Sequence, residues 1–256
     1  MGYFIKHMIL SFQNPILQTH DMIQLQRLCP FLLTIDYQPS PHNNHYKNKD
    51  CITYPILPFW KYLIHLPTWH DEPLSTCIQT LGPQLESLHT FISPSISASP
   101  LQLFPFLNTS ILFTNLKELH LDFRSFDRNN NDESISMNQD TLDIIHQKCP
   151  VLKKLKIQHI HLIYDPFPIT TLGSSSCIQP HNGLTTLELE NLYILDPEFF
   201  CYLFKKYPNL LYFKMIFGEK DPISSEATDT KWILQDTIQY GFPHLITCDI
   251  LFNNKN

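Results

Sequence analysis

Glycine is scarce in this chain, with 6 residues in 256, and the motifs that depend on it are missing. Phosphate-binding loops use glycine to bring the backbone close to the phosphate, and the sequence contains no loop of that kind. The G-x-S-x-G turn of serine hydrolases and the H-E-x-x-H motif of zinc proteases are also missing. We therefore expect no catalytic residues and no bound cofactor, and we predict a protein that is not an enzyme.

The chain also lacks clusters of basic residues and long apolar runs. Its formal net charge is −6, which provides no general attraction for nucleic acid or anionic lipid. No 18 consecutive residues are apolar, so no membrane span is expected. The apolar patch in residues 1–12 is interrupted by Lys6 and His7 and lacks the cleavage site of a signal peptide. We expect a protein of the cytosol or nucleus that binds neither nucleic acid nor membranes.

Metal-binding spacings are missing too. The seven cysteines include no C-x-x-C pair, and their odd, scattered distribution is typical of reduced thiols. His42 and His45 share a polar loop without a cysteine or acid at ligand spacing. His159 and His161 are expected on one face of a strand, but no third ligand is apparent nearby. Solvated or hydrogen-bonded histidines explain both pairs better, so we expect no metal site.

What the sequence does contain is a repeated apolar pattern. A proline or polar residue and one further residue precede the spacing L-x-x-L-x-L, with apolar substitutes. The first apolar positions of the copies are Leu32, Leu85, Leu116, Leu152, Leu184, Leu210 and Leu245. The interval of 85 − 32 = 53 residues covers two periods, and a weak copy lies within residues 58–65, with Trp60 and Leu63 at apolar positions. Self-similarity at this period is typical of repeat architectures.

The pattern alternates between two kinds of secondary structure. Its last two apolar positions are two residues apart, which is strand spacing, and such strands bury their apolar face by stacking in parallel. Between strands the spacing becomes helical, as at Leu142, Ile145 and Cys149. Asp196-Pro197-Glu198 is typical of a helix start. A bundle of leucine-rich helices is the alternative, but it does not explain why the prolines share the register of the copies.

The resulting fold prediction is an α/β leucine-rich-repeat solenoid of horseshoe shape. Short parallel strands line its concave face, helices line its convex face, and there are about seven to eight irregular repeats. We expect a single domain over residues 1–256, with residues 1–20 as an N-terminal flanking segment and residues 21–252 as the repeats. Polar insertions fall on the rims of such a fold. The C-terminal end is expected to need a covering partner or a further segment.

A concave sheet provides a surface for binding, and the strand residues between the apolar anchors point toward it. Their charges alternate in sign along the repeats, which suits a protein partner better than a uniform polyanion. By register, the candidate protein-binding residues are Asp36, His89, Glu118, His120, Asp122, Lys156, Glu188, Glu190, Tyr212, Lys214 and Asp249. Tyr212 and Lys214 are expected to contribute most to binding. An ordinary solvated face without a dedicated partner is the alternative.

The segment 140–157, with Leu142, Ile145, Cys149-Pro150, Leu152, Leu155 and Ile157 on its pattern, resembles the cysteine-containing class of leucine-rich repeat. In layout, including residues 60–69, the chain is similar to the repeat region of fungal F-box/leucine-rich-repeat proteins. That resemblance implies a substrate-recognition part of an SCF-type ubiquitin ligase. The twenty or so residues before the first repeat contain no F-box motif of the L-P-x-E-I type. Skp1 and cullin are therefore expected only if a longer product carries an F-box, and the alternative is a stand-alone binding scaffold without a ligase role.

Overall fold

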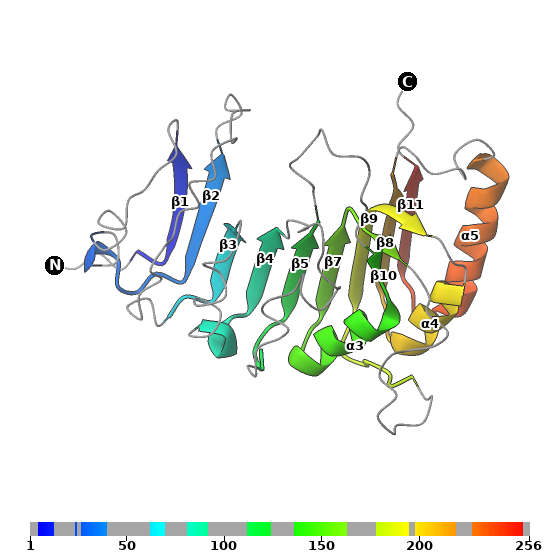
Figure 1. Cartoon of the computed structure of the whole chain (residues 1–256), viewed down its shortest axis with the longest axis horizontal. Helices are drawn as coiled ribbons and strands as arrows, with labels where there is room; N and C mark the ends of the chain where they lie inside the picture. The colour runs from blue at the N-terminus through cyan, green and yellow to red at the C-terminus, as the bar shows by residue number, and fades with distance from the viewer. Residues whose placement is uncertain are drawn as a thin grey trace.

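The computed structural model describes residues 5–12, 24, 27–39, 62–69, 81–91, 112–123, 136–162, 178–194, 198–218 and 227–252. Within them the chain is an α/β protein whose strands pair in parallel, which confirms the predicted class. The main sheet has the order β1-β2-β3-β4-β5-β7-β9-β10-β11, so its strands follow the order of the chain, with two short strands outside this path coming between them (Figure 1). Its strands are β1 (His7–Phe12), β2 (Thr34–Pro39), β3 (His65–Trp69), β4 (Ser87–Phe91), β5 (Glu118–Asp122), β7 (Lys154–Gln158), β9 (Thr186–Ile194), β10 (Tyr212–Phe217) and β11 (Thr247–Phe252).

The same backbone turn recurs before most of these strands. The amide of the first leucine anchor donates to the carbonyl three residues earlier in six copies, as from Leu152 to Cys149 (3.2 Å) and from Leu210 to Tyr207 (3.2 Å). Residues at this earlier position are buried, because the turn points them into the core; Cys149 and Tyr207 are both 0% exposed. Burial raises the pKa of the Cys149 thiol to about 12, as suits a structural cysteine rather than a nucleophile.

A second backbone contact joins each turn to its predecessor. The residue that follows each first anchor donates its backbone amide to the carbonyl of the corresponding residue in the previous copy. Examples are Lys153 to Lys117 (2.8 Å) and Leu211 to Thr185 (2.9 Å). Equivalent contacts run without interruption from Lys6, before β1, to Ile246, before β11. The strands therefore begin in register, and that register aligns the side chains of the whole sheet.

The helices follow the predicted spacing in the C-terminal half. Helix α3 (Gln139–Lys148) begins after Asn138, whose side chain accepts a hydrogen bond from the Thr141 amide at 3.2 Å. Helix α4 (Glu198–Lys206) carries an acid in its first turn and lysines in its last, as the helix dipole favours. Helix α5 (Ala227–Gly241) contacts β11 and α4. The residue before Glu198 lies outside the described residues, so the proposed capping role of Asp196 stays a prediction.

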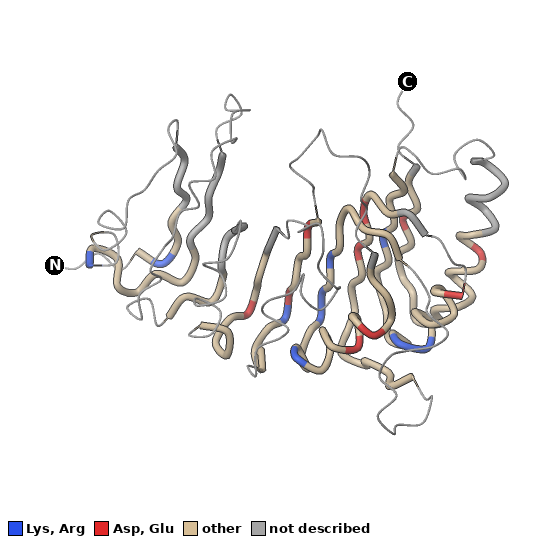
Figure 2. Tube along the Cα trace, in the orientation of Figure 1, with Lys and Arg blue, Asp and Glu red and all other residues tan. Residues whose placement is uncertain are grey.

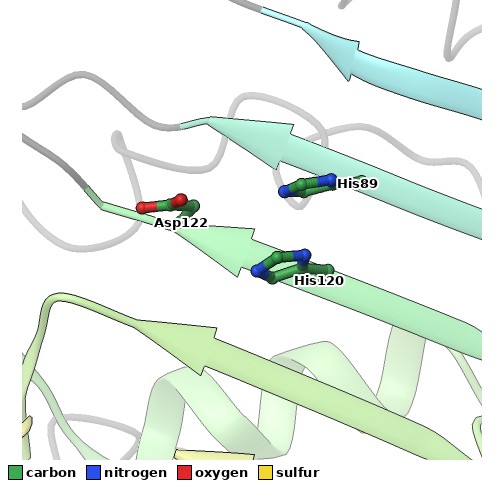
Figure 3. A group of neighbouring side chains, drawn as sticks. All are labelled: His89, His120 and Asp122. Atoms are coloured by element: carbon green, nitrogen blue, oxygen red, sulfur yellow. The ribbon is translucent and has the colours of Figure 1, made fainter. Parts of the chain in front are cut away.

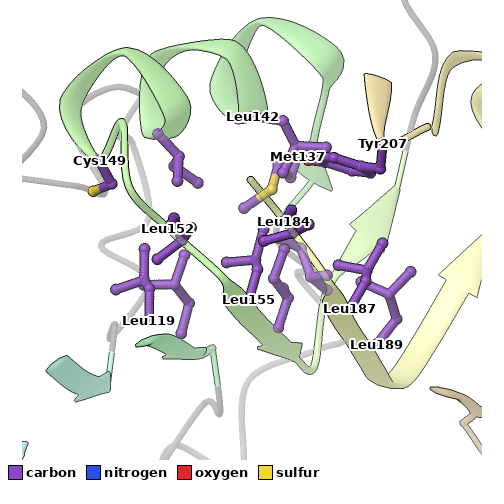
Figure 4. Packing of buried hydrophobic residues seen from close by; sticks show 14 of the residues in the cluster. Leu119, Met137, Leu142, Cys149, Leu152, Leu155, Leu184, Leu187, Leu189 and Tyr207 are labelled. Carbon is purple, nitrogen blue, oxygen red and sulfur yellow. The ribbon is translucent and has the colours of Figure 1, made fainter. Parts of the chain in front are cut away.

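The core lies between the apolar face of the sheet and these helices. Leu119, Leu155 and Leu187 are register partners on β5, β7 and β9, and each is about 1% exposed or less. Leu142 of α3 packs over this row (Figure 4). The first anchors Leu32, Leu85, Leu116, Leu152, Leu184 and Leu210 are 0% exposed, which confirms their assignment, and Leu245 packs against the cluster.

Three sequence expectations are corrected here. The predicted N-terminal flank contains strand β1, which pairs with β2 from His7↔Thr34 to Phe12↔Pro39. The weak copy begins three residues later than expected, because Leu63 occupies the first anchor position and β3 aligns His65 with Thr34 and Ser87. His159 and His161 do not share one strand: His159 follows β7 with a positive φ of 60°, and His161 belongs to the short strand β8 (His161–Leu162).

Two further features are not part of the repeated apolar pattern. Strand β6 (Ser136–Met137) pairs with β8, which in turn pairs with the end of β9. Helix α5, which precedes β11, begins at Ala227. It packs on α4 so closely that a Cβ atom on Gly241 would lie 2.5 Å from ring atoms of Phe204. Glycine at the end of α5 therefore permits this contact.

Candidate functional site: the polar face of the sheet

The face of the main sheet opposite the core carries rows of polar side chains. The middle row runs across six strands through His89, His120, Lys156, Glu188, Lys214 and Asp249, which are successive register partners. Glu118 and Tyr212 lie in the row before it, and Asp122 and Glu190 lie in the row after it. Asp36 lies apart on β2, where its backbone is the register partner of Ile9 on β1. The structure thus brings ten of the eleven candidate residues together on one face.

Lysines and glutamates on this face neutralise one another. Lys156 Nζ is 2.8 Å from Glu190 Oε2 and 3.9 Å from Glu188 Oε2. Lys154 Nζ lies 2.8 Å from the other oxygen of Glu188, and Lys214 Nζ lies 2.7 Å from Glu190 Oε1. The alternation of charge sign, which the sequence suggested as a match for a partner, therefore stabilises the sheet across β7, β9 and β10 (Figure 2).

Glu190 is at the centre of this network. Burial alone would raise its carboxyl pKa, but hydrogen bonds from Lys156 and Lys214 outweigh that effect and lower the pKa to about 2. The amide nitrogen of Gln158 also donates to Glu190 Oε2. Glu190 is therefore ionised at neutral pH, and its charge is shared between two lysines rather than offered to a partner.

Two candidate contact residues differ from the expectation that they would be exposed. Asp122 has no exposed surface and Glu190 is 8% exposed. Glu190 is covered by the lysines that bind it, and the Asp122 carboxylate accepts a hydrogen bond from His159, which lies beyond the end of β7. The residues more accessible to a protein partner are Glu118, which is exposed, Lys154, with 41% of its side chain exposed, and the partly exposed Tyr212.

Three of the candidate residues form a cluster of potential metal ligands. One ligand atom each from His89, His120 and Asp122 lies within 4.8 Å of the other two. The two imidazoles stack across β4 and β5 with centroids 3.7 Å apart and 14° between their planes, and Asp122 lies beyond them toward the end of β5 (Figure 3). Sequence reasoning assigned all three to one face but missed the cluster, because His89 and His120 are neighbours only through the pairing of β4 with β5.

The orientation of Asp122 is held by a short polar chain. Asn191 Nδ2 lies 3.0 Å from His159 Nε2, and His159 Nδ1 lies 3.0 Å from Asp122 Oδ1. His159 therefore lies between Asn191 and Asp122, and its Nδ1 is the atom that reaches the carboxylate. Asn191 and His159 have positive φ values of 52° and 60°, and Asn191 is the extra residue of a bulge where the β9–β10 register shifts.

A second histidine cluster lies in the core. His146 of α3 is 6% exposed, its ring centroid is 4.0 Å from that of His181, and its Nε2 lies 2.8 Å from the hydroxyl of Tyr207. Burial, with the nearby His181 and Lys206, lowers the pKa of His146 to about 2. Burial also lowers the pKa of His181. Both rings are therefore neutral in the folded protein, and this cluster supports the packing of α3 on the turn before β10.

His42 and His45, the other histidines considered as ligands, lie outside the described residues. Within the described part of the chain, the helices are all too short or too polar to cross a membrane. Comparison of the chain with family models, with curated proteins and with solved structures found no match.

Proposed function

We propose that this chain is a leucine-rich-repeat solenoid that serves as a protein-protein interaction scaffold. The single observation that carries the proposal is the unbroken series of equivalent backbone contacts from Lys6 to Ile246, which joins parallel strands in chain order. Each contact links one copy of the apolar pattern to the next, as expected of stacked repeats. In a solenoid, the curvature of the stack makes the strand face concave and suits it to binding an extended partner surface.

The polar face is the proposed binding surface. Its lysine–glutamate network holds the side chains of β7, β9 and β10 in fixed positions, so little conformational entropy remains to be lost when a partner binds. Tyr212 is the favoured anchor, because it lies partly exposed on this face and its hydroxyl is held by Asp249 Oδ2 at 3.1 Å. Tyrosine is enriched among residues that dominate the energy of protein interfaces.

Within this function we propose the role of substrate receptor for an SCF-type ubiquitin ligase, located in the cytosol or nucleus. The support is the resemblance of the repeats around Cys149 to those of F-box proteins, together with free thiols at Cys29, Cys149, Cys201 and Cys248. Skp1 and cullin would join through an F-box in a longer product. The alternative is a stand-alone scaffold without a ligase role.

The test is affinity capture from native extract by the tagged full chain, read by mass spectrometry. Tyr212→Ala is the test variant, because it removes the proposed anchor without breaking the lysine–glutamate network. Tyr240→Ala is the matched control, since Tyr240 is 93% exposed on α5. Circular dichroism of both variants verifies that they are folded.

We expect a client protein whose recovery falls about tenfold or more with Tyr212→Ala and is unchanged with Tyr240→Ala. Recovery of Skp1 and cullin with that client supports the ligase receptor, and a client without them supports the stand-alone scaffold. Equal loss in both variants, or no client sensitive to Tyr212→Ala, would refute binding through this face.

A further inference from the structure

We propose that His89, His120 and Asp122 form a binding site for a divalent transition-metal ion, with Zn²⁺ as the probe. This site goes beyond the proposed scaffold function and does not depend on it. The three residues come from two adjacent strands of the polar face, where the backbone register fixes them side by side. Two imidazoles and a carboxylate are a ligand set that zinc and neighbouring metals accept.

The hydrogen bonds around His120 leave one of its nitrogens able to bind a metal. The ionised Glu190 accepts from the Gln158 amide nitrogen, so the Gln158 oxygen faces His120 Nε2, at 2.6 Å. Because that oxygen can only accept, Nε2 carries the proton in the metal-free protein, so a metal either binds Nδ1 or replaces the Gln158 contact at Nε2.

Asp122 is the anionic member of the set. Its side chain is fully buried, and its carboxylate accepts a hydrogen bond from His159 Nδ1 at 3.0 Å. A divalent cation bound beside Asp122 would offset the charge of this carboxylate. The contact from His159 also fixes the carboxylate orientation, a role that partners of metal ligands commonly serve.

Metal binding requires a defined change in the two imidazoles. With metal–ligand bonds of about 2.1 Å, the ligand atoms of a tetrahedral site lie roughly 3.4 Å apart. The ligand atoms now lie within 4.8 Å of one another, so the longest of these separations must decrease by about 1.4 Å. Rotation of the side chains can supply this change. Parallel rings 3.7 Å apart cannot both direct an in-plane lone pair at one ion, so the stack of His89 on His120 must open.

The test is titration of the metal-free full chain with Zn²⁺ at pH 7.5, followed by calorimetry, with NMR of the histidine rings as a structural readout. The test variants are His89→Gln, His120→Gln and Asp122→Asn. His65→Gln is the matched control, because His65 lies on β3 in the row that precedes His89. Urea unfolding of each variant establishes that a loss of zinc binding is not due to unfolding. Because His89 is partly exposed, we expect His89→Gln to keep the fold.

We expect one Zn²⁺ per chain, an affinity at least tenfold weaker in each test variant, and an unchanged affinity for His65→Gln. The ring signals of His89 and His120 should shift together on saturation. Absence of zinc binding, or binding that survives His89→Gln and His120→Gln, would overturn the site. Loss of zinc on substitution of His42 or His45 alone would assign the metal elsewhere and overturn it as well. Capture of a client by the chain without zinc would leave the scaffold proposal standing whatever the outcome here.

Discussion

Acidification from pH 7 to pH 5 should destabilise the folded protein through His146. The imidazole pKa is 6.5 in the unfolded chain and about 2 in the folded protein, because the ring is buried beside His181 and Lys206. The folded pKa is the lower of the two, so protonation favours the unfolded chain. The contribution of neutral His146 to the free energy of unfolding is therefore complete above pH 6.5. It declines as the pH falls from there toward the pKa in the folded protein.

The magnitude follows from proton linkage. Each pH unit below 6.5 lowers the free energy of unfolding by about 1.4 kcal/mol for one such group, so the step from pH 7 to pH 5 costs about 2 kcal/mol. His146 is 6% exposed, so solvent screening removes little of this effect. His181 and His120, whose pKa values are also lowered by burial, add losses in the same direction. Glu190 begins to contribute only below its unfolded pKa of 4.5.

The assay is urea unfolding at pH 7, 6 and 5, followed by circular dichroism, for three proteins. His146→Gln keeps a polar atom near the Tyr207 hydroxyl but cannot titrate. His244→Gln removes an exposed histidine from the turn between α5 and β11 and serves as the control. The loss between pH 7 and pH 5 should be about 2 kcal/mol smaller in His146→Gln than in the wild type, and the control should match the wild type. A His146→Gln profile parallel to the wild type would refute the reasoning.

Three substitutions test the packing and the charge network by urea unfolding at pH 7. Leu155→Ala should lower the free energy of unfolding by about 3 kcal/mol through a core cavity, whereas Leu211→Ala, at 38% exposure, should change it by less than about 0.5 kcal/mol; equal losses would contradict the core assignment. Glu190→Gln should lower the free energy of unfolding by about 2 kcal/mol, because two lysines lose their carboxylate partner. Glu118 is exposed, so Glu118→Gln should change the free energy of unfolding little. Glu190→Gln should also remove acid sensitivity between pH 4.5 and 2, because the lowered folded pKa stabilises the protein only above that range. Gly241→Ala should cost about 1–3 kcal/mol by overpacking α5 against α4, and an unchanged unfolding midpoint would contradict that contact.

The apolar framework could be predicted because its signal is local. A leucine anchor, the turn before it and the strand after it lie within nine residues, and six of the seven predicted first anchors are fully buried. Helix α3 was predictable for the same reason, since Leu142 and Ile145 lie on one helical face. Strand β1 was missed, because only residues 7–12 carry it and the helical pattern that precedes other strands is not recognisable there.

The candidate site was harder to predict, because its contacts depend on register between strands. His89 and His120 are 120 − 89 = 31 residues apart, and no sequence pattern in the segment between them indicates that they align. The alternation of lysine and glutamate was visible, but spacing alone could not show whether those charges pair with one another or with a partner. The three-residue error in the predicted register of the weak copy has the same origin. Spacing alone favoured Trp60 as its first apolar position, whereas strand pairing places Leu63 there.

The sheet order has a consequence for cooperativity. Within the main sheet each described strand pairs with the strands next to it in the sheet order, so its hydrogen bonds join segments that lie about one repeat apart in the chain. Closing one repeat costs less chain entropy than pairing segments that are several repeats apart, so folding can propagate from any stable pair of neighbouring strands. Opening can likewise stay local: β1 and β2 can separate from the rest without disturbing β7, β9 and β10. Different parts of this one sheet can therefore differ in stability.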